Sequence, residues 1–226
     1  TIRNIIGQPK SAFDIRGIMD TGKVLLMNLS KGKIGDINAQ LLGLIFVNKV
    51  NMAALSRAEV PQDQRRRFYL YVDEFQNFIT DAFATILSEA RKYELALIMA
   101  HQYIGQLTDK TSASEGANSK IRDAVFGNVG TIMSFKIGAE DAEYMAKEMA
   151  PVLSEQDVIG IPNFHCYTKL NINNTTSRPF SMGTIYDEKD RNEKLAGLIK
   201  EYSRMKYGRK KIFVDQEIED RIGIKR

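Results

Sequence analysis

The feature that most constrains the fold of this chain is an apolar run that ends abruptly in two adjacent carboxylates. Phe68 to Val72 form the run, and Asp73 and Glu74 follow it directly. Because the run is rich in aromatic and β-branched residues and lacks polar alternation, it predicts a strand buried on both faces of a parallel sheet. Ligands of such sheets gather beyond the carboxyl ends of the strands, so we expect both carboxylates at the edge of a site.

The run and its carboxylates are typical of a Walker B strand, in which the two acidic residues have different roles. We expect Asp73 to help hold a Mg²⁺ that bridges nucleotide phosphates, and Glu74 to orient and polarise the attacking water. The alternative is that the pair only caps the following helix, since carboxylates favour helix N-termini.

The composition limits the classes of protein to which the chain can belong. Of its 226 residues, 43% are apolar and 27% are charged, as in an ordinary globular protein. No stretch approaches the roughly 18 consecutive apolar residues that cross a bilayer, and the N-terminus has no basic-then-apolar signal pattern. We therefore expect a cytoplasmic location, with any membrane anchor lying upstream of this sequence.

Cysteine and histidine are scarce. The single Cys166 excludes an intramolecular disulfide, and the distant His101 and His165 offer no zinc cluster. A bound metal should therefore have oxygen ligands.

The chain is mildly basic, with a net charge of +4 and a pI near 9.0. This charge is compatible with a nucleic-acid partner but does not demonstrate one. The segment Arg65 to Arg67 has two interpretations: it contacts phosphate or, as we favour, it marks the solvated beginning of the strand at Phe68.

Strands and helices alternate along most of the chain. Apolar runs predict the strands, and apolar residues at helical spacing predict the helices between them. The alternation predicts an α/β fold with a mostly parallel sheet and helices on both faces. The predicted strands are Val24–Leu29, Phe68–Val72, Leu95–Ala100 and Thr131–Phe135, and the predicted helices are Asp36–Arg57, Ala82–Tyr93, a short one ending near Phe126, and Ala139–Met149.

The pattern changes beyond Pro162. Phe164–Ile172 and Arg178–Ile185 have more polar alternation and are separated by a polar turn segment, which predicts an antiparallel hairpin. A charged helix is expected from Asp187 to about Lys206.

The last residues, 207–226, mix basic and acidic side chains with few large apolar anchors. We expect them to form a mobile or partner-bound extension. The predicted domains are therefore residues 1–186 and a charged helical C-terminal extension of residues 187–226.

One segment imitates a phosphate-binding loop. Gly17 to Lys23 satisfies the pattern G-x-x-x-x-G-K, but Val24 stands where a hydroxyl is needed for Mg²⁺. The segment also precedes a predicted strand, whereas phosphate binding requires it to follow a strand and open a helix. We interpret it as a Gly-Lys turn. The phosphate-binding Walker A loop is then expected upstream, or missing from a degenerate domain.

A wider pattern gives a resemblance to a known family. Asp73 and Glu74 are followed by a helix containing Ser88 to Tyr93 and then by a strand that ends in His101 and Gln102. In this order the sequence resembles the TraG/TraD-like coupling ATPases of conjugation and type IV secretion, members of the HerA/FtsK class of RecA-like motors. The resemblance covers about Gly22 to Tyr207, is strongest from Tyr71 to Gln106, and is supported by Gly130–Gly138 and Ala139–Ala142.

The resemblance implies that Gln102 is the polar sensor of the nucleotide site and binds the nucleotide together with Asp73 and Glu74. An amide can donate to phosphate and accept from water, so it can report whether the γ-phosphate is present. The alternative is a satisfied polar group at a strand end.

The resemblance also implies that Arg91 is an arginine finger presented to the nucleotide of a neighbouring subunit. A guanidinium can neutralise charge on the transferring phosphoryl oxygens. A surface salt bridge with Glu94 or Glu89 is an equally weighted alternative.

At the level of the whole protein, the resemblance implies a RecA-like P-loop NTPase core and a ring, hexameric in this family, that uses ATP and Mg²⁺ to translocate DNA. DNA would be held mainly through its phosphates, and the loop from Thr108 to Ser119, with Lys110 and Lys120, is a candidate channel element. Relaxosome or secretion-channel proteins are further expected partners. The chain is expected to be the C-terminal part of such a motor, inactive by itself. The alternative function is a non-hydrolysing docking module.

Overall fold

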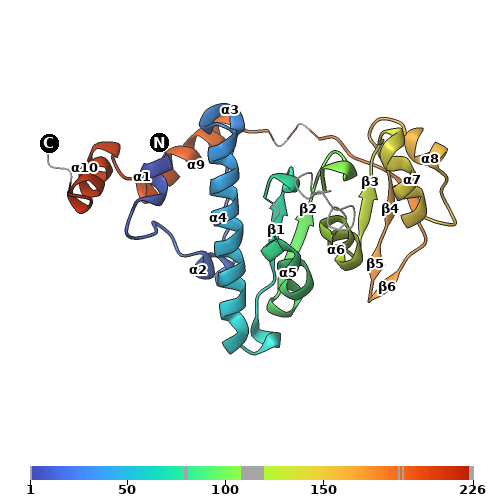
Figure 1. Ribbon diagram of the computed structural model, residues 1–226, viewed down its shortest axis with the longest axis horizontal. Coiled ribbons are helices and arrows are strands. Elements are labelled where there is room, and N and C mark those ends of the chain that lie inside the picture. The colour runs from blue at the N-terminus through green and yellow to red at the C-terminus, as the bar shows by residue number, and fades with distance from the viewer. Residues whose placement is uncertain (1, 79–80, 108–119, 188, 190, 224–226) are drawn as a thin grey trace. The chain divides into compact units, whose positions relative to one another are not determined.

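The computed structural model describes residues 2–78, 81–107, 120–187, 189 and 191–223. Contacts divide the chain into two compact units: unit 1 comprises Thr1–Ser56 and Asp187–Arg226, and unit 2 comprises Arg57–Tyr186 (Figure 1). The predicted domains were residues 1–186 and 187–226, whereas the contacts group residues 1–56 with residues 187–226. The division into two domains at residue 187 stays a prediction.

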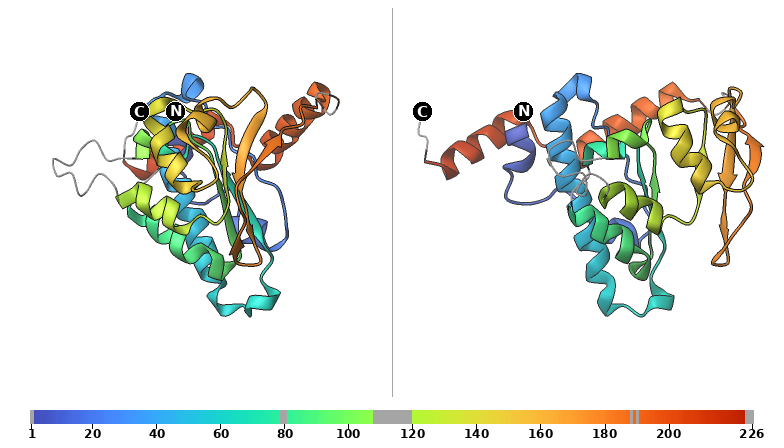
Figure 2. Two further views of the ribbon diagram at one scale, coloured as in Figure 1. Left: turned by 90° about the vertical axis from the view of Figure 1, so that its right-hand side faces the viewer. Right: turned by 45° about the vertical axis from the view of Figure 1, so that its right-hand side comes forward.

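Unit 2 contains a parallel pair of strands, β1 (Phe68–Val72) and β2 (Leu95–Met99). Val72 lies opposite Met99, so the two strands end at the same level. The helices α5 and α6 pack against each other on one side of this pair (Figure 2). The helical elements between α4 (Asp36–Leu55) and the third strand of the chain are η1 (Ser56–Glu59), η2 (Gln62–Gln64), η3 (Phe75–Phe78), α5 (Asp81–Glu89), η4 (Ala90–Tyr93), η5 (Ile104–Leu107) and α6 (Lys120–Asn128).

Burial along β1 alternates. Leu70 and Val72 are buried, whereas Tyr69 and Tyr71 are 53% and 73% exposed. The strand is therefore buried on one face, and the prediction that it is buried on both is wrong. Aromatic residues with a polar hydroxyl tolerate the open face, which is why an uninterrupted apolar run did not reveal it.

A second sheet of unit 2 is antiparallel, in the order β3 (Ile132–Ser134), β4 (His165–Lys169) and β7 (Phe180–Gly183). It confirms the predicted hairpin. The hairpin tip continues as β5 (Asn171–Ile172) and β6 (Thr175–Thr176), joined by Asn173 and Asn174. Both turn residues have positive φ, 51° and 63°, as a two-residue hairpin turn of type I′ requires.

Two helices pack beside this sheet, α7 (Ala139–Glu148) and α8 (Glu155–Ile159). Ala142 of α7, Val158 of α8 and Ile161 form a buried cluster against which Tyr167 of β4 packs. Ser154 and Asp157 form a capping box at the start of α8.

Unit 1 contains the long helix α4 (Asp36–Leu55), on which α2 and α3 pack. The stretch Asp36–Glu59 is long and apolar enough to cross a membrane, a test of length and composition that the core helix of a soluble protein also passes. Its buried residues recur every three or four positions and form one stripe: Ala39, Gly43, Val47, Val50 and Ala54. The remaining helices of unit 1 are α1 (Ile2–Ile6), α2 (Ile15–Asp20), α3 (Lys31–Ile34), α9 (Glu193–Tyr207) and α10 (Lys211–Arg221).

The segment expected to be a mobile or partner-bound extension contains an ordered helix. Val214 and Ile218 of α10 are buried, and Asp215 accepts hydrogen bonds of 2.8 Å each from Arg3 and Asn4 of α1. Apolar residues four apart on α10 supply the anchor that the charged composition concealed.

The predicted strand Val24–Leu29 is wrong, because these residues lie outside every described strand. Val24 and Leu26 are 84% and 83% exposed. Strand propensity alone does not form a strand, since its backbone groups need a neighbouring strand with which to pair.

Among the described residues, the predicted parallel sheet is found only as the β1–β2 pair. The run Thr131–Phe135 supplies β3, which pairs antiparallel with β4 and not in parallel with β2. An apolar run predicts a buried strand but carries no information about the direction of its neighbour.

Candidate functional site

The predicted acidic pair and the predicted sensor leave the parallel strands at the same edge. Ala100 donates its backbone N–H to the carbonyl of Val72 over 2.9 Å, and Phe75 donates to the carbonyl of Ala100 over 3.1 Å. These two bonds extend the β1–β2 pairing past the strand ends. They bring the backbone of Asp73 and Glu74 beside that of Gln102.

Glu74 and Gln102 are in direct contact. Gln102 Nε2 donates to Glu74 Oε1 over 2.6 Å, and Gln76 Nε2 donates to Glu74 Oε2. Glu74 is half-buried and has a positive φ of 50°. A left-handed conformation is rare for a residue with a side chain, and such strain clusters at functional sites.

Asp73 is exposed at the end of β1. Its Oδ1 accepts the backbone N–H of Glu74 over 3.0 Å. The helix that the capping alternative invokes, α5, begins only at Asp81, after the 3₁₀ turn η3. The carboxylate therefore stabilises the local turn and does not cap α5.

The aromatic residue after the acidic pair anchors the site. Phe75 is 1% exposed, with its ring 6.1 Å from that of Phe83 and 5.2 Å from that of His101. His101 meets Phe75 edge-on and has no hydrogen-bond partner at Nδ1 in the described structure. The described contact of its ring is therefore with Phe75.

The described residues contain no group of three or more acidic, histidine or cysteine side chains that could hold a metal by themselves. This donor set fits Mg²⁺, which keeps several waters and binds through one or two carboxylates together with substrate phosphates. Asp73 offers such a carboxylate at the strand edge.

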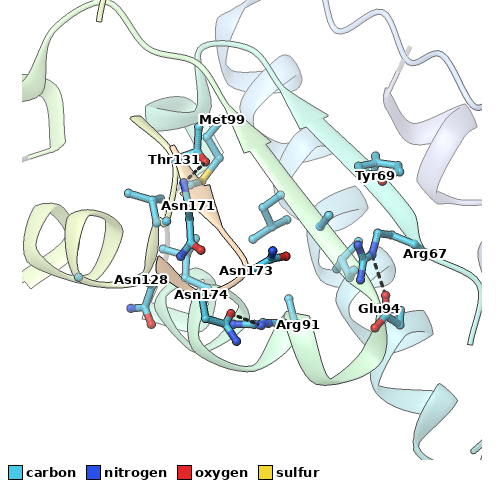
Figure 3. A pocket seen from close by; sticks show the side chains of 18 residues that line it. Arg67, Tyr69, Arg91, Glu94, Met99, Asn128, Thr131, Asn171, Asn173 and Asn174 are labelled. Carbon is cyan, nitrogen blue, oxygen red and sulfur yellow. Dashed lines mark hydrogen bonds and ion pairs between the residues drawn. The ribbon is translucent and has the colours of Figure 1, made fainter. Parts of the chain in front are cut away.

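The structure does not bring Arg91 to Glu74 and Gln102. Arg91 belongs to η4, which precedes β2, and its Nη2 donates to Asn174 Oδ1 over 2.8 Å. Figure 3 shows this contact in a cavity of about 740 Å³ between the exposed edge of β2 and the hairpin tip. Among the described contacts Arg91 pairs with neither Glu89 nor Glu94, and Glu94 pairs with Arg67 at 2.8 Å.

The basic segment before β1 has a structural role. Arg65 donates to the carbonyl oxygens of Val60, at 2.8 Å, and Lys92. The fully buried Arg57 donates to the carbonyls of Arg66 and Tyr93, at 3.0 and 3.1 Å. These two residues shortly precede β1 and β2, so Arg57 connects the beginnings of the two strands. Sequence reasoning missed Arg57, since nothing distinguishes it from a surface arginine at a helix end.

Of the remaining predicted features, the segment that imitates a phosphate-binding loop can be placed. Gly17 lies inside α2, and the segment up to Lys23 forms the end of that helix and its C-terminal turn. It does not open a helix, as a phosphate-binding loop does. The candidate channel loop at 108–119, with Lys110, and the side chain of Lys120 lie outside the described residues.

Sequence reasoning missed two residues that support the site. Gln76 holds the second oxygen of Glu74, and Asn77 Nδ2 donates to the Glu74 carbonyl over 2.9 Å. A signal was available, because two amide residues that follow an acidic pair with only Phe75 between them are suited to bind it.

Two comparisons with known proteins give matches. Residues 67–160 match a family model described as "TraM recognition site of TraD and TraG". The structure is similar to that of TrwBdeltaN70, a bacterial conjugative coupling protein, with a TM-score of 0.59 and 15% sequence identity. The match covers 80% of this chain and 45% of that one, so this chain corresponds to less than half of the TrwB structure. No curated protein gives a significant match.

At this identity the likeness to TrwB concerns the fold, and the family model covers the segment with the acidic pair, Arg91 and Gln102. Both findings support the resemblance found in the sequence. Between residues 67 and 160 this chain therefore resembles the TraG/TraD-like coupling proteins of conjugation.

Proposed function

We propose that this chain is part of an ATP-driven translocation motor of the type IV secretion coupling class and carries the Walker B acidic pair and the sensor of a RecA-like core. One observation carries the proposal: the 2.6 Å hydrogen bond from Gln102 to Glu74, at the coincident ends of two parallel strands. Ligands of open α/β sheets bind at such an edge.

The three residues at this edge have distinct roles. Bound ATP with Mg²⁺ supplies the phosphoanhydride and the charge neutralisation for phosphoryl transfer. Asp73, exposed and with one oxygen outside its turn contact, is the residue suited to hold the ion. Glu74 orients the attacking water and accepts its proton, and the two amides that hold its carboxylate fix its direction.

Gln102 reports the state of the site. Its amide donates to Glu74 in the present geometry, and the same group can donate to a phosphate oxygen. Exchange between these two acceptors links the position of Glu74 to the presence of the γ-phosphate.

Arg91 acts on a neighbouring subunit in this proposal. It precedes β2, whereas Gln102 follows it, and a five-residue strand spans about 13 Å at roughly 3.3 Å per residue. One nucleotide bound at the carboxyl edge of the strands is therefore out of reach of Arg91 of the same subunit. Action in trans requires head-to-tail contacts that close into a ring.

The partners follow from the family. DNA, held through its phosphates, is the proposed transported substrate, and the proposed assembly is a hexameric ring at the cytoplasmic face of the membrane. The family model is described by its recognition of TraM, which favours relaxosome proteins as partners.

The test uses the full-length protein. ATP turnover that depends on Glu74 and Gln102 supports the proposal, and turnover that survives both Glu74→Gln and Gln102→Leu contradicts it. The isolated chain is expected neither to bind ATP tightly nor to hydrolyse it. Micromolar binding by the isolated chain, measured by calorimetry and lost in Lys23→Ala, would show that the Gly17 segment is a true phosphate-binding loop.

The second candidate is a docking module that does not hydrolyse ATP. The description of the matched family and the exposed apolar side chains of α9, Leu198, Tyr202 and Met205, favour it. The two functions separate on one measurement: a docking module retains partner binding in the full-length protein and has no nucleotide-dependent activity.

A further inference from the structure

A buried carboxylate on α7, 39 positions after Gln102 in the sequence, binds the backbone two residues beyond Gln102. The Oδ2 of Asp141, in the first turn of α7, accepts the backbone N–H of Ile104 over 3.0 Å. Ile104 begins η5, two residues after Gln102. Asp141 is only 8% exposed, so this bond is formed away from solvent.

The same face of α7 holds Ile104 by packing. Asp141, Met145 and Met149 follow one another at intervals of four residues and therefore share a helix face. Met145 and Met149, 4% and 0% exposed, form a buried cluster with Ile104, which is 7% exposed. The polar contact fixes the backbone of the segment after β2, and the apolar contacts fix its side chain.

The burial of the Asp141 carboxylate is energetically unfavourable by itself. Removing a carboxylate from water is unfavourable unless hydrogen bonds compensate. An acidic residue in the first turn of a helix also interacts favourably with the helix dipole, but the exposed neighbour Glu140 supplies that interaction without burial. The contact with Ile104 distinguishes Asp141 from Glu140.

We propose that Asp141 is the positioning residue of the sensor: through the backbone of Ile104 it fixes the short segment from which Gln102 reaches Glu74. Only Tyr103 lies between Ile104 and Gln102, so a displacement of the Ile104 backbone also displaces Gln102. Movement of Gln102 between Glu74 and a phosphate is in turn coupled to α7 and, through Ala142 and Val158, to α8.

The first test needs no nucleotide and uses this 226-residue chain. In Asp141→Ala, the amide of Ile104 should exchange at least about tenfold faster by NMR, since a buried hydrogen bond is lost. The side-chain amide resonances of Gln102 should shift toward those seen in Glu74→Ala, in which the sensor has lost its partner. The matched control Glu140→Ala should leave both signals unchanged.

Two results would overturn the proposal. One is faster exchange at Ile104 with the Gln102 resonances unmoved, which makes Asp141 merely structural. The other is no change at either position. If Asp141→Ala does not fold, the same measurement is made on Asp141→Asn, whose amide oxygen is a weaker acceptor for the Ile104 N–H. A partial shift of the Gln102 resonances in that variant supports the proposal, and no shift contradicts it.

The second test rests on the proposed function. In the full-length protein, Asp141→Ala should lower kcat at least about tenfold and leave the ATP dissociation constant within about threefold, whereas a general loss of structure would affect both. Asp141→Asn should recover part of kcat. If the full-length wild-type protein has no ATPase activity, the proposed function fails, but the NMR result on the position of Gln102 stands or falls separately.

Discussion

Arg91 donates to the side-chain oxygen of Asn174, a turn residue 83 positions later in the sequence. This hydrogen bond is exposed and should contribute little to stability. Replacing Arg91 with Ala should therefore change the free energy of unfolding by less than about 1 kcal/mol, as measured by urea denaturation.

The same substitution should reduce ATP turnover of the full-length ring by about 10³-fold if the guanidinium acts across an interface. Mixing supplies the check: Glu74→Gln subunits, which lack the base, and Arg91→Ala subunits, which lack the finger, should form some competent interfaces when combined. Asn174→Gly is the matched control, since it keeps the positive φ of the turn, releases Arg91 and should retain turnover. Failure of mixing to restore any activity would count against action in trans.

Replacing Glu74 separates chemistry from backbone conformation. Glu74→Gln should retain ATP binding in the full-length protein and lose turnover by about 10²-fold or more, as expected for loss of a general base. Glu143→Gln, at an exposed ion pair with Lys147, is the control and should retain turnover. Undiminished turnover in Glu74→Gln would remove Glu74 from the mechanism.

Glu74→Gly should raise the free energy of unfolding of the isolated chain by about 1 kcal/mol, because glycine adopts positive φ without the cost borne by other residues. Denaturant unfolding of the wild-type chain and of Glu74→Gly under the same conditions measures the difference. A less stable Glu74→Gly variant would show that the contacts of the Glu74 side chain outweigh the backbone cost.

Replacing Gln102 with Leu should lower turnover of the full-length protein by about 10²-fold, since a preorganised donor is lost from the site. ATP binding should remain within about threefold if Asp73 and the phosphate-binding loop supply most of the affinity. Single-turnover kinetics distinguishes loss of chemistry from loss of binding. Turnover within twofold of wild type would return Gln102 to the role of a satisfied polar group at a strand end.

The contact between α1 and α10 should depend on pH. The side-chain hydrogen bond from Arg3, followed by that from Asn4, holds the pKa of Asp215 below its ordinary value. A carboxylate with a lowered folded-state pKa stabilises the fold above the unfolded value of about 3.9, and this contribution is lost as the pH falls through the folded value. The carboxyl ¹³C shift of Asp215 should therefore titrate below about pH 3.9, and Arg3→Ala should raise the midpoint. An unmoved midpoint in Arg3→Ala would exclude Arg3 as the main cause.

Phe75 is the aromatic residue that anchors the site. Phe75→Ala should lower the free energy of unfolding by about 3–5 kcal/mol, since it opens a cavity beside Phe83 and His101. Phe135→Ala makes the same change at a position 49% exposed and should cost about 1 kcal/mol or less. Equal losses in denaturant unfolding would mean that Phe75 is not a core residue.

The part of the site that could be predicted depends on residues close in sequence or on a general rule. The run before Asp73 indicates a strand, and the ends of neighbouring parallel strands meet, so the position of Asp73 and Glu74 at one edge of the sheet could be predicted. The prediction required no knowledge of the rest of the sheet. Gln102 entered through the resemblance to a family.

The rest depends on contacts that local pattern does not encode. The partner of Arg91 lies on a distant hairpin, and the contact of Asp141 with Ile104 requires the position of α7. The failed strand at Val24–Leu29 has the same cause: an apolar run states a preference for extended structure, but only a neighbouring strand can satisfy it. The sequence likewise did not determine whether β3, which is three residues long, pairs in parallel or antiparallel with its neighbour.

The pairing of β1 with β2 has a practical consequence for anyone who expresses this segment alone. Bonds from Phe68 to Glu94 and from Ala100 to Val72 direct alternate backbone groups of β2 toward β1, so those of Leu95, Leu97 and Met99 face the other way. No described strand pairs with β2 on that side. An open strand edge of this kind is a template for aggregation, and a lysine at position 97 should keep concentrated preparations monomeric where the wild-type sequence associates edge to edge.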